Sequence, residues 1–512
     1  MSTKKILAVL LALFVLATAV SGCGNSGSSS ADSQSGSSAT SENSASTEDT
    51  ASTDGEVPTI SLMVVCGTTP PDADAVAEKL SEITREKIGC NVEFITMEIG
   101  NVAQQLNLLL SGGDDTLNVF MAGISVPYST IVNNGQALSL DTLMEPYAEE
   151  VKTALGEKVY ESGRVNGELY GIGRLLDQAS TTCYNLRRDI AEEFGYKNGD
   201  KVDLAELTEL FGKVREKYPD TPLIGPMNGV PSIGDSRIDS LGNKLGVLDN
   251  YGQDTTVTNY YESAGYEELV GYFKQWKEMG CYMADILNVT DAPIDYIPSG
   301  KAFGCFASHF SAEMNGIWSS QNFGTDIASL QIYEDAVAIT PGAYECINPA
   351  TKNPEAAAAL IYLMATDPDV ENLLINGIEG QHYQVLEDNT ATYVDGKDIS
   401  TTGWCLGYSW TALNSTISIP FEYPADYYDR LLEANKNAQQ SKAFGCQFDL
   451  TGVSDAVSAC TNVVNQYENA LSGGAVEDFD ATLAQFQQGL REAGIDEIVA
   501  AKQEQLDAFL AG

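Results

Sequence analysis

Histidine and positive charge are both scarce in this sequence. The 512 residues include two histidines, His309 and His382, and 28 Lys and Arg against 72 Asp and Glu, which gives a formal net charge of -44 at pH 7. Two histidines offer few bases for Ser–His or Cys–His catalysis. A chain this acidic is also a poor partner for nucleic acid or anionic lipid headgroups. We interpret the acidic surface mainly as a source of solubility.

The motifs of several enzyme classes are missing as well. The chain has no HExxH, no GxSxG, no Walker loop and no GxGxxG after a strand. Its cysteines form neither a CxxC pair nor a Cys/His zinc pattern, and the nine that follow Cys23 are most simply small buried residues. The sequence therefore predicts no metal site, no cofactor and no catalysis.

Long apolar runs are confined to the N-terminus. Lys4 and Lys5 precede an apolar run from Ile6 to Val20, which is short for a membrane span and typical of an export signal. The run ends in Val20-Ser21-Gly22-Cys23, which resembles the bacterial lipobox. We predict a signal peptide over residues 1–22, lipidation of Cys23, and anchoring at the extracytoplasmic face of the bacterial cell membrane.

A tract without aromatic residues, Leu or Ile follows Cys23 and extends to about Val57. Ser, Gly, Ala, Thr and acidic residues dominate it, so it cannot bury enough apolar surface to offset the entropy of ordering. We predict that residues 23–57 are a flexible linker between the lipid anchor and a globular body. The lipid anchor is then the protein's one contact with the membrane.

Behind the linker, short β-branched runs alternate with helical patterns. A strand is predicted over Thr59–Cys66, a helix with Val76, Leu80 and Ile83 on one face, and a second strand over Asn91–Met97. Such βαβ order indicates a parallel sheet covered on both faces.

The length from Pro58 to Gly512 is enough for two lobes. A strand over Thr181–Leu186 opens a second α/β stretch, a strand over Ala336–Ile339 precedes a helix capped by Asn353, and the C-terminus is helical. We predict an N-terminal lobe of residues 58–172 plus about 336–399. The C-terminal lobe takes 173–335 plus about 400–512.

Several segments resemble the extracellular solute-binding proteins of family 1. Val165–Ile172 (VNGELYGI) is similar to a family passage that enters the second lobe, although Gly173 stands where proline is usual. Cys183–Ile190, Asn348–Ala356 and Gly377–Tyr383 (GIEGQHY) resemble further motifs, the last one typical of the LipO-like subgroup with a C-terminal extension. The matches follow one another in the family's order along most of the chain.

This resemblance implies a fold and a function. The fold is α/β of the periplasmic-binding-protein-like type II class: two lobes joined by a hinge, with a helical C-terminal extension. The expected function is capture of a small polar ligand, with an oligosaccharide favoured, by hinge closure and its delivery to the permease of an ABC importer. Nucleic acid is not an expected partner.

The resemblance also places candidate ligand contacts at the cleft between lobes. Thr68 and Thr69 follow the first strand, where a plain turn role is the alternative, and Tyr128 either reaches the ligand or packs against its own loop. Arg174 and Asp177 follow the crossing into the second lobe. They either bind hydroxyl groups or form a salt bridge at the hinge.

Further candidates lie in the second half of the cleft. Asn228 either binds or is a turn residue. Ser308, His309 and Phe310 are predicted to begin a helix whose free N–H groups face the ligand, with a core role as the alternative for His309. Trp404, Tyr408 and Trp410 alternate along one predicted strand face, where they form either a stacking wall for a sugar or core packing.

Two rival functions stay open at this point. A secreted glycosidase needs two suitably placed carboxylates, and 72 acidic residues make chance pairs easy to find. A peptide-binding surface lipoprotein fits the anchor and linker equally well. Closure around a ligand without turnover would exclude the enzyme, and a ligand screen separates sugar from peptide.

Overall fold

The computed structural model describes residues 57–176, 178–227, 233–289, 291–333, 336–398, 400–404 and 412–511. The predicted signal peptide, Cys23 and residues 24–56 of the predicted linker lie outside this range. Four predicted ligand contacts, Asp177, Asn228, Tyr408 and Trp410, lie outside it too. Within the described range, no helix is both long enough and apolar enough to cross a bilayer.

The first sheet has five strands in the order β2-β1-β3-β11-β6. Its second strand β1 (Thr59–Cys66) is parallel to β2 (Asn91–Glu98) and to β3 (Val119–Ala122), whereas β11 (Tyr344–Ile347) is antiparallel to β3 and to β6 (Gly171–Gly173). The predicted βαβ unit is confirmed. A wholly parallel sheet was wrong, because β11 returns to this sheet from the second one.

Helices cover both faces of the first sheet. Ile60, Leu62 and Val64 of β1 belong to one apolar cluster, and Met63 and Val65 belong to another. A strand buried on both faces explains why the sequence of β1 is apolar at nearly every position. The helices around this sheet are α1 (Ala73–Ile88), α2 (Val102–Ser111), α3 (Tyr128–Asn133), α4 (Asp141–Met144), α5 (Ala148–Leu155), α6 (Glu157–Glu161), α13 (Pro354–Thr366) and α14 (Pro368–Asn376).

The second sheet is built around β7 (Ala179–Arg187). Strands β8 (Gly304–His309), β9 (Ile327–Gln331) and β10 (Val337–Ala338) are all antiparallel to β7, and β14 (Gln439–Gln440) is parallel to β10. Its neighbours are α7 (Arg188–Glu193), α8 (Leu204–Lys217), α9 (Asp249–Gly252), α10 (Ala264–Glu278), α11 (Pro293–Tyr296) and α12 (Ala312–Phe323). Two hairpins complete the strands: β4 (Arg164–Val165) with β5 (Glu168–Leu169), and β12 (Tyr383–Val385) with β13 (Ala391–Tyr393).

The chain passes between the two sheets three times. The link from β6 to β7 and the link from β10 to β11 run antiparallel, joined by hydrogen bonds from Arg174 N to Ala343 O (3.1 Å) and from Ile339 N to Gln178 O (3.2 Å). The third link begins beside Leu175, whose N–H donates to Leu413 O (2.9 Å), and continues through α15 (Tyr427–Asn437) into β14. We call these three segments the crossings. The lobe boundaries given above stay predictions.

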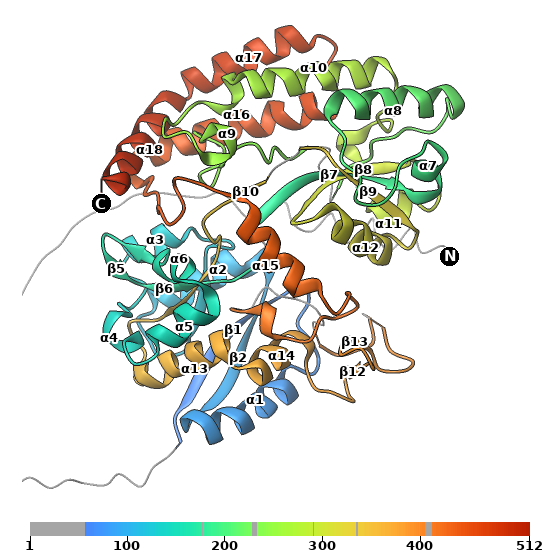
Figure 1. Cartoon of the computed structure of the whole chain (residues 1–512). Coiled ribbons are helices and arrows are strands. Elements are labelled where there is room, and N and C mark those ends of the chain that lie inside the picture. The colour runs from blue at the N-terminus through green and yellow to red at the C-terminus, as the bar shows by residue number, and fades with distance from the viewer. Residues whose placement is uncertain are drawn as a thin grey trace, which may run out of the picture. The chain divides into compact units, whose positions relative to one another are not determined.

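The C-terminal end is helical, as predicted, with α16 (Ser454–Ser472), α17 (Phe479–Glu492) and α18 (Ile495–Leu510). The side chain of Asp478 caps α17, and Phe479, Phe486 and Leu490 of the predicted stripe are buried. Helices α16 and α17 pack along α10 in one layer (Figure 1). Tyr467 and Tyr261 both pack their rings against Phe486 there.

All eight cysteines in the described range are buried and free. Burial raises the pKa of the Cys183 and Cys305 thiols to about 12. The prediction that these cysteines are small buried residues is therefore confirmed for those eight.

Candidate functional site

The loop after β1 carries two predicted contacts at the end of the first sheet. Thr68 and Thr69 are exposed there. The loop is anchored by Asp72, whose carboxylate lies 3.1 Å from Nε2 of the fully buried His382. His382 Nδ1 accepts a hydrogen bond from Ile378 N (2.8 Å), so the proton sits on Nε2 and the ring donates to Asp72. The GIEGQHY motif thus fixes the loop that presents both threonines.

Tyr128 is packed rather than presented to solvent. Its side chain is 4% exposed, its hydroxyl donates to Gly163 O, and its ring stacks on Tyr344 with centroids 4.1 Å apart. The structure therefore buries Tyr128 in the core, where it contacts β11 and the residue before β4 instead of packing against its own loop.

Arg174 lies in the first crossing and is 5% exposed. Its Nε donates to Ala412 O (2.7 Å) in the third crossing. Two fully buried carboxyl groups lie close enough to interact with it, Glu345 on β11 and Glu371 on α14. Burial raises the pKa of each carboxyl to about 8, against the opposing effect of Arg174. We call Arg174, Glu345 and Glu371 the crossing cluster.

Ser308, His309 and Phe310 lie at the end of the second sheet. The helix predicted to begin with them was wrong: β8 continues to His309 because His309 and Ser308 pair with Thr181 and Thr182 of β7, and α12 begins at Ala312. Ser308 is exposed, His309 half-buried and Phe310 buried. Burial lowers the pKa of His309 to about 4, so its ring is neutral at pH 7.

Four polar atoms at this end of the second sheet are shielded from water and have no hydrogen-bond partner within the described range. They are Gln178 Nε2, Thr181 Oγ1, His309 Nδ1 and Tyr333 Oη. Gln178 leads into β7, and Tyr333 follows β9, whose neighbour Ile332 donates to Thr182 O (2.9 Å). Buried polar atoms in native proteins are nearly always paired. Unpaired polar atoms at these strand ends, beside the crossings, are therefore candidate partners for a polar ligand.

Aromatic rings from α15 lie next to the same strand end. Tyr423 and Tyr427 stack with centroids 4.0 Å apart, and Tyr427 meets Phe310 edge-on at 5.3 Å. Both tyrosines are half-buried, so part of each ring faces outward. Sequence reasoning missed them. Their spacing of four residues at the start of a helix was the available signal.

The predicted aromatic wall of Trp404, Tyr408 and Trp410 is described only at Trp404. That side chain is 5% exposed, its Nε1 donates to Leu374 O (3.3 Å), and its ring stacks on Phe94 with centroids 5.7 Å apart. Trp404 thus packs in the core of the first sheet, the alternative role considered for it. A stacking role for Tyr408 and Trp410 stays a prediction.

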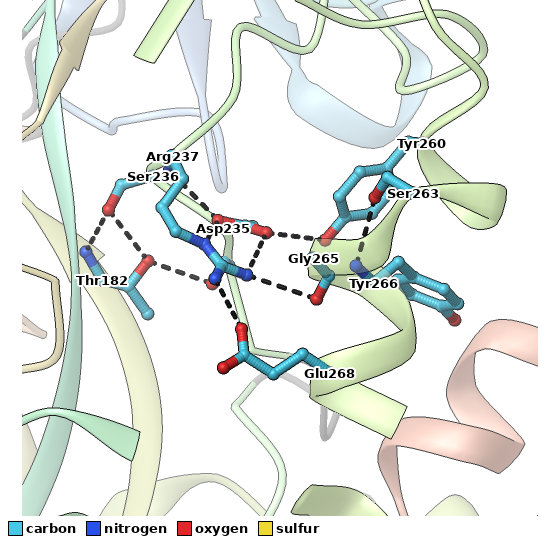
Figure 2. A network of polar contacts seen from close by, with 10 residues as sticks. Thr182, Asp235, Ser236, Arg237, Tyr260, Ser263, Gly265, Tyr266 and Glu268 are labelled. Carbon is cyan, nitrogen blue, oxygen red and sulfur yellow. Dashed lines mark hydrogen bonds and ion pairs between the residues drawn. The ribbon is translucent and has the colours of Figure 1, made fainter. Parts of the chain in front are cut away.

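A charged network, which sequence reasoning also missed, holds the loop from Gly234 to Arg237. Arg237 binds both carboxylate oxygens of Asp235 (2.9 and 3.0 Å), and Asp235 also accepts from the hydroxyl of Tyr260 (3.2 Å). Figure 2 shows Arg237 reaching Glu268 and Gly265 O of α10 as well, at 2.8 and 3.3 Å. We call this set of contacts the Arg237 network.

The Arg237 network contacts Tyr333, which carries one of the unpaired atoms, and strand β7. The guanidinium of Arg237 lies over the ring of Tyr333, 4.6 Å from its centroid. On the other side, Thr182 Oγ1 donates to Gly234 O (3.0 Å), next to Ser308 in the ladder. The network therefore fixes the position of Tyr333 and ties the loop to β7.

A larger pocket lies elsewhere. It has a volume of about 930 Å³ and is formed by the β4–β5 hairpin, residues 440–447 and the end of α18, and none of the predicted contacts lines it. Within the described range no group of three His, Cys, Asp or Glu residues is placed to hold a metal ion.

Comparison with known proteins gives two sequence matches. Residues 442–511 match the family described as "Domain of unknown function (DUF3502)". A carbohydrate ABC transporter substrate-binding protein of Streptococcus pneumoniae is 23% identical over 474 residues, which cover 90% of this chain and 92% of that protein.

Solved structures with the same fold cover most of the chain. The N-glycan transport solute binding protein (NgtS) of Streptococcus pneumoniae has a TM-score of 0.76 at 20% identity, covering 89% of this chain and 99% of that one. An HMO binding, ABC-transporter-associated solute binding protein from Bifidobacterium longum infantis has a TM-score of 0.62 at 16% identity, covering 88% of this chain and 99% of that one. These likenesses confirm the type II periplasmic-binding-protein-like fold and the resemblance to extracellular solute-binding proteins.

Proposed function

We propose that this chain is the solute-binding protein of an ABC importer and that it captures an oligosaccharide at the crossing end of the second sheet. The observation that carries the proposal is that the unpaired Nδ1 of His309 lies next to Phe310, against which Tyr427 of the stacked pair Tyr423 and Tyr427 packs. The named binding partners of similar proteins support the ligand class: NgtS was crystallised with Man1GlcNAc and with Man5GlcNAc.

The chemistry of the site suits a neutral sugar. Pyranose rings present C–H faces, which stack on tyrosine, and hydroxyl groups, which both donate and accept. The neutral His309 ring, the Thr181 and Tyr333 hydroxyls and the Gln178 amide supply matching donors and acceptors. Each atom would recover on binding the hydrogen bond it lacks, so ligand affinity gains from every one of them.

The protein binds and releases its ligand by a hinge motion and does not convert it. The three crossings are the connections about which the two sheets turn, and turning them together encloses the ligand. The crossing cluster does not serve a glycosidase, because both of its carboxyl groups are fully buried away from a substrate. Lipidation at Cys23, placement outside the cytoplasm and docking to a permease complete the proposal.

Binding is tested by isothermal titration calorimetry with Man1GlcNAc, Man5GlcNAc, maltotriose and a tripeptide. We expect saturable binding of at least one glycan, with the glycan recovered unchanged and the radius of gyration reduced by closure. A ligand at 100 times its Kd adds about 2.7 kcal/mol to the free energy of unfolding. Cleavage of the glycan, or binding of the tripeptide alone, contradicts the proposal.

A pair of variants localises the site. Tyr427→Ala should weaken glycan binding about tenfold, since it removes a stacking face worth about 1.4 kcal/mol. Tyr362→Ala is the matched control, because Tyr362 also stacks on a tyrosine, Tyr147 at 4.6 Å, but does so on the helices of the first sheet. Equal losses of affinity in the two variants would place the ligand elsewhere.

A further inference from the structure

The stretch Leu241–Tyr251 has an unusual backbone. Eight non-glycine residues in the described range have a positive φ, and four of them lie here: Leu241 (44°), Lys244 (58°), Asn250 (53°) and Tyr251 (53°). Left-handed backbone is unfavourable for residues with a side chain and persists where surrounding contacts impose it. We call Leu241–Tyr251 the strained stretch; its backbone conformation is held by the following contacts.

The strained stretch is coupled directly to the Arg237 network. Tyr251 N donates to Arg237 O (2.6 Å), and Asp239 exchanges two backbone hydrogen bonds with Leu248 (2.9 and 3.0 Å). Asn250 and Tyr251 also line, with Asp235 and Arg237, a pocket of about 230 Å³. A shift of the stretch therefore reaches Arg237 within a few bonds and, through Arg237, the ring of Tyr333.

Lys502 of α18 holds the turn at the start of the stretch. Its side chain is fully buried, and Nζ donates to Leu241 O (3.0 Å), Asn243 Oδ1 (2.7 Å) and Gly246 O (3.1 Å). An ammonium group has three donors, so all three are used. The fit is close: a Cβ at Gly246 would lie 3.2 Å from Lys502 Cδ.

Other contacts come from the same C-terminal segment. Gln503 accepts from Val257 N (2.6 Å) and donates to Thr255 O (3.0 Å), just beyond the strained stretch. Lys442 N donates to Gly252 O (2.8 Å), and Lys244 Nζ pairs with Glu468 (3.3 Å). Residues 442–511, which match a family of unknown function, thus contact the strained stretch at several positions from Leu241 to Gly246, and they contact Gly252 directly after it.

We propose that residues 442–511 position the ligand site by imposing the conformation of the strained stretch, with Lys502 as the principal positioning residue. None of the hydrogen bonds described for this segment involves Gln178, Thr181, His309 or Tyr333. It acts through Arg237 and Tyr333. The effect on affinity rests on the proposed function, whereas the effect on the backbone does not.

The experiment compares Lys502→Met with Lys274→Met in the purified protein. Lys274 also contacts the C-terminal segment, through an ion pair with Asp480 (3.2 Å), but its partner lies on α17 and it does not touch the stretch. Hydrogen exchange should rise at least tenfold at the amides of Leu241–Gly252 in Lys502→Met and stay unchanged in Lys274→Met. The Kd for Man5GlcNAc should rise about tenfold in Lys502→Met alone.

Chemical rescue separates positioning from general damage. In Lys502→Ala, millimolar ethylammonium chloride should restore slow exchange in the stretch and the wild-type Kd, because the cation reoccupies the three oxygen acceptors. Sodium chloride at equal ionic strength should not. Wild-type exchange in Lys502→Met, or equal changes in the Lys274 control, would overturn the proposal.

Two kinds of failure can be distinguished: a Lys502 variant that does not fold, and a wild-type protein that binds no glycan. If the Lys502 variants do not fold, Gln503→Ala takes their place and should speed exchange at Thr255–Thr258. Unchanged exchange there overturns the proposal. If the wild-type protein binds no glycan, the proposed function fails, and the exchange measurements still decide whether the C-terminal segment imposes the backbone.

Discussion

Two arginines in this protein each face two carboxyl groups, with opposite results. In the Arg237 network, Asp235 receives two bonds from the guanidinium and one from Tyr260. In the crossing cluster, neither oxygen of Glu345 has a hydrogen-bond partner within the described range. The Asp235 carboxylate is thus held by three hydrogen bonds, whereas burial drives Glu345 towards its neutral form.

Burial outweighs the donor that the crossing cluster supplies: Glu371 accepts a hydrogen bond from Leu413 N (3.0 Å), and burial still raises its pKa to about 8. A desolvated carboxylate loses several kcal/mol of hydration, which one shared cation does not restore. Asp235 is 2% exposed at its side chain and yet fully bonded. The Arg237 network is therefore a rigid support, whereas the crossing cluster stores protons where the sheets connect.

A change of pH should have the largest effect, because it ionises the two acids of the crossing cluster. Because the pKa values of Glu345 and Glu371 are raised to about 8 in the folded protein, the folded state holds more protons than the unfolded state above about pH 4.5. Their stabilising contribution is full below that pH and is lost as the pH rises through 8. The free energy of unfolding should fall by on the order of 7 kcal/mol between pH 5 and pH 8, about half of it from each acid.

The double variant Glu345→Gln/Glu371→Gln is the control for that titration. Urea unfolding at pH 5 and pH 8 should give it a flatter profile than the wild-type protein. Identical profiles would show that the two acids are ionised at both pH values.

Removal of the better-paired arginine comes next. Arg237→Met leaves the buried Asp235 without its cation and should lower the free energy of unfolding by about 3 kcal/mol at pH 7, measured in urea. Arg491→Met, which removes a more exposed ion pair with Glu262, serves as the control and should cost under about 1 kcal/mol. Equal costs would mean that the Arg237 network is not a support.

A smaller effect is expected at Tyr333, where one substitution separates its contact with Arg237 from its proposed contact with the ligand. Tyr333→Phe keeps the ring under Arg237 and deletes the unpaired hydroxyl. Stability should be unchanged or slightly higher, while glycan affinity falls about fivefold, equivalent to about 1 kcal/mol. A loss of stability with unchanged affinity would assign Tyr333 to the network alone.

The smallest effect is expected at Glu268, the more exposed of the two carboxylates that pair with Arg237. Glu268 binds the same arginine as Asp235, but its side chain is 50% exposed. Glu268→Gln should cost about 0.5 kcal/mol in urea unfolding, because water replaces the lost charge. A cost comparable to that of Arg237→Met would show that exposure does not weaken this pair.

Local patterns predicted much of this fold. The β1–α1–β2 unit and the stripe of α17 follow from periodicity within a single segment, and Gly89 ends α1 with a left-handed φ of 70°. The strand β11 was missed because it is four residues long and its partners lie in distant parts of the chain. Pairing over such separations leaves no periodic signal.

The site was predictable only in part, for the same reason. Ser308, His309 and Phe310 lie where a ligand site was expected, at the end of a strand. Tyr427 packs against Phe310 from another segment, and no local pattern connects the two. The dense aromatic cluster attracted attention to Trp404, but composition does not reveal that this ring is buried against Phe94.

The buried thiols bear on how the protein matures. Eight cysteines are enclosed in the native core, with no covalent link among them. None of these eight side chains needs an oxidant or a disulfide isomerase to take its place in the core. Their packing is therefore the same under reducing and oxidising conditions.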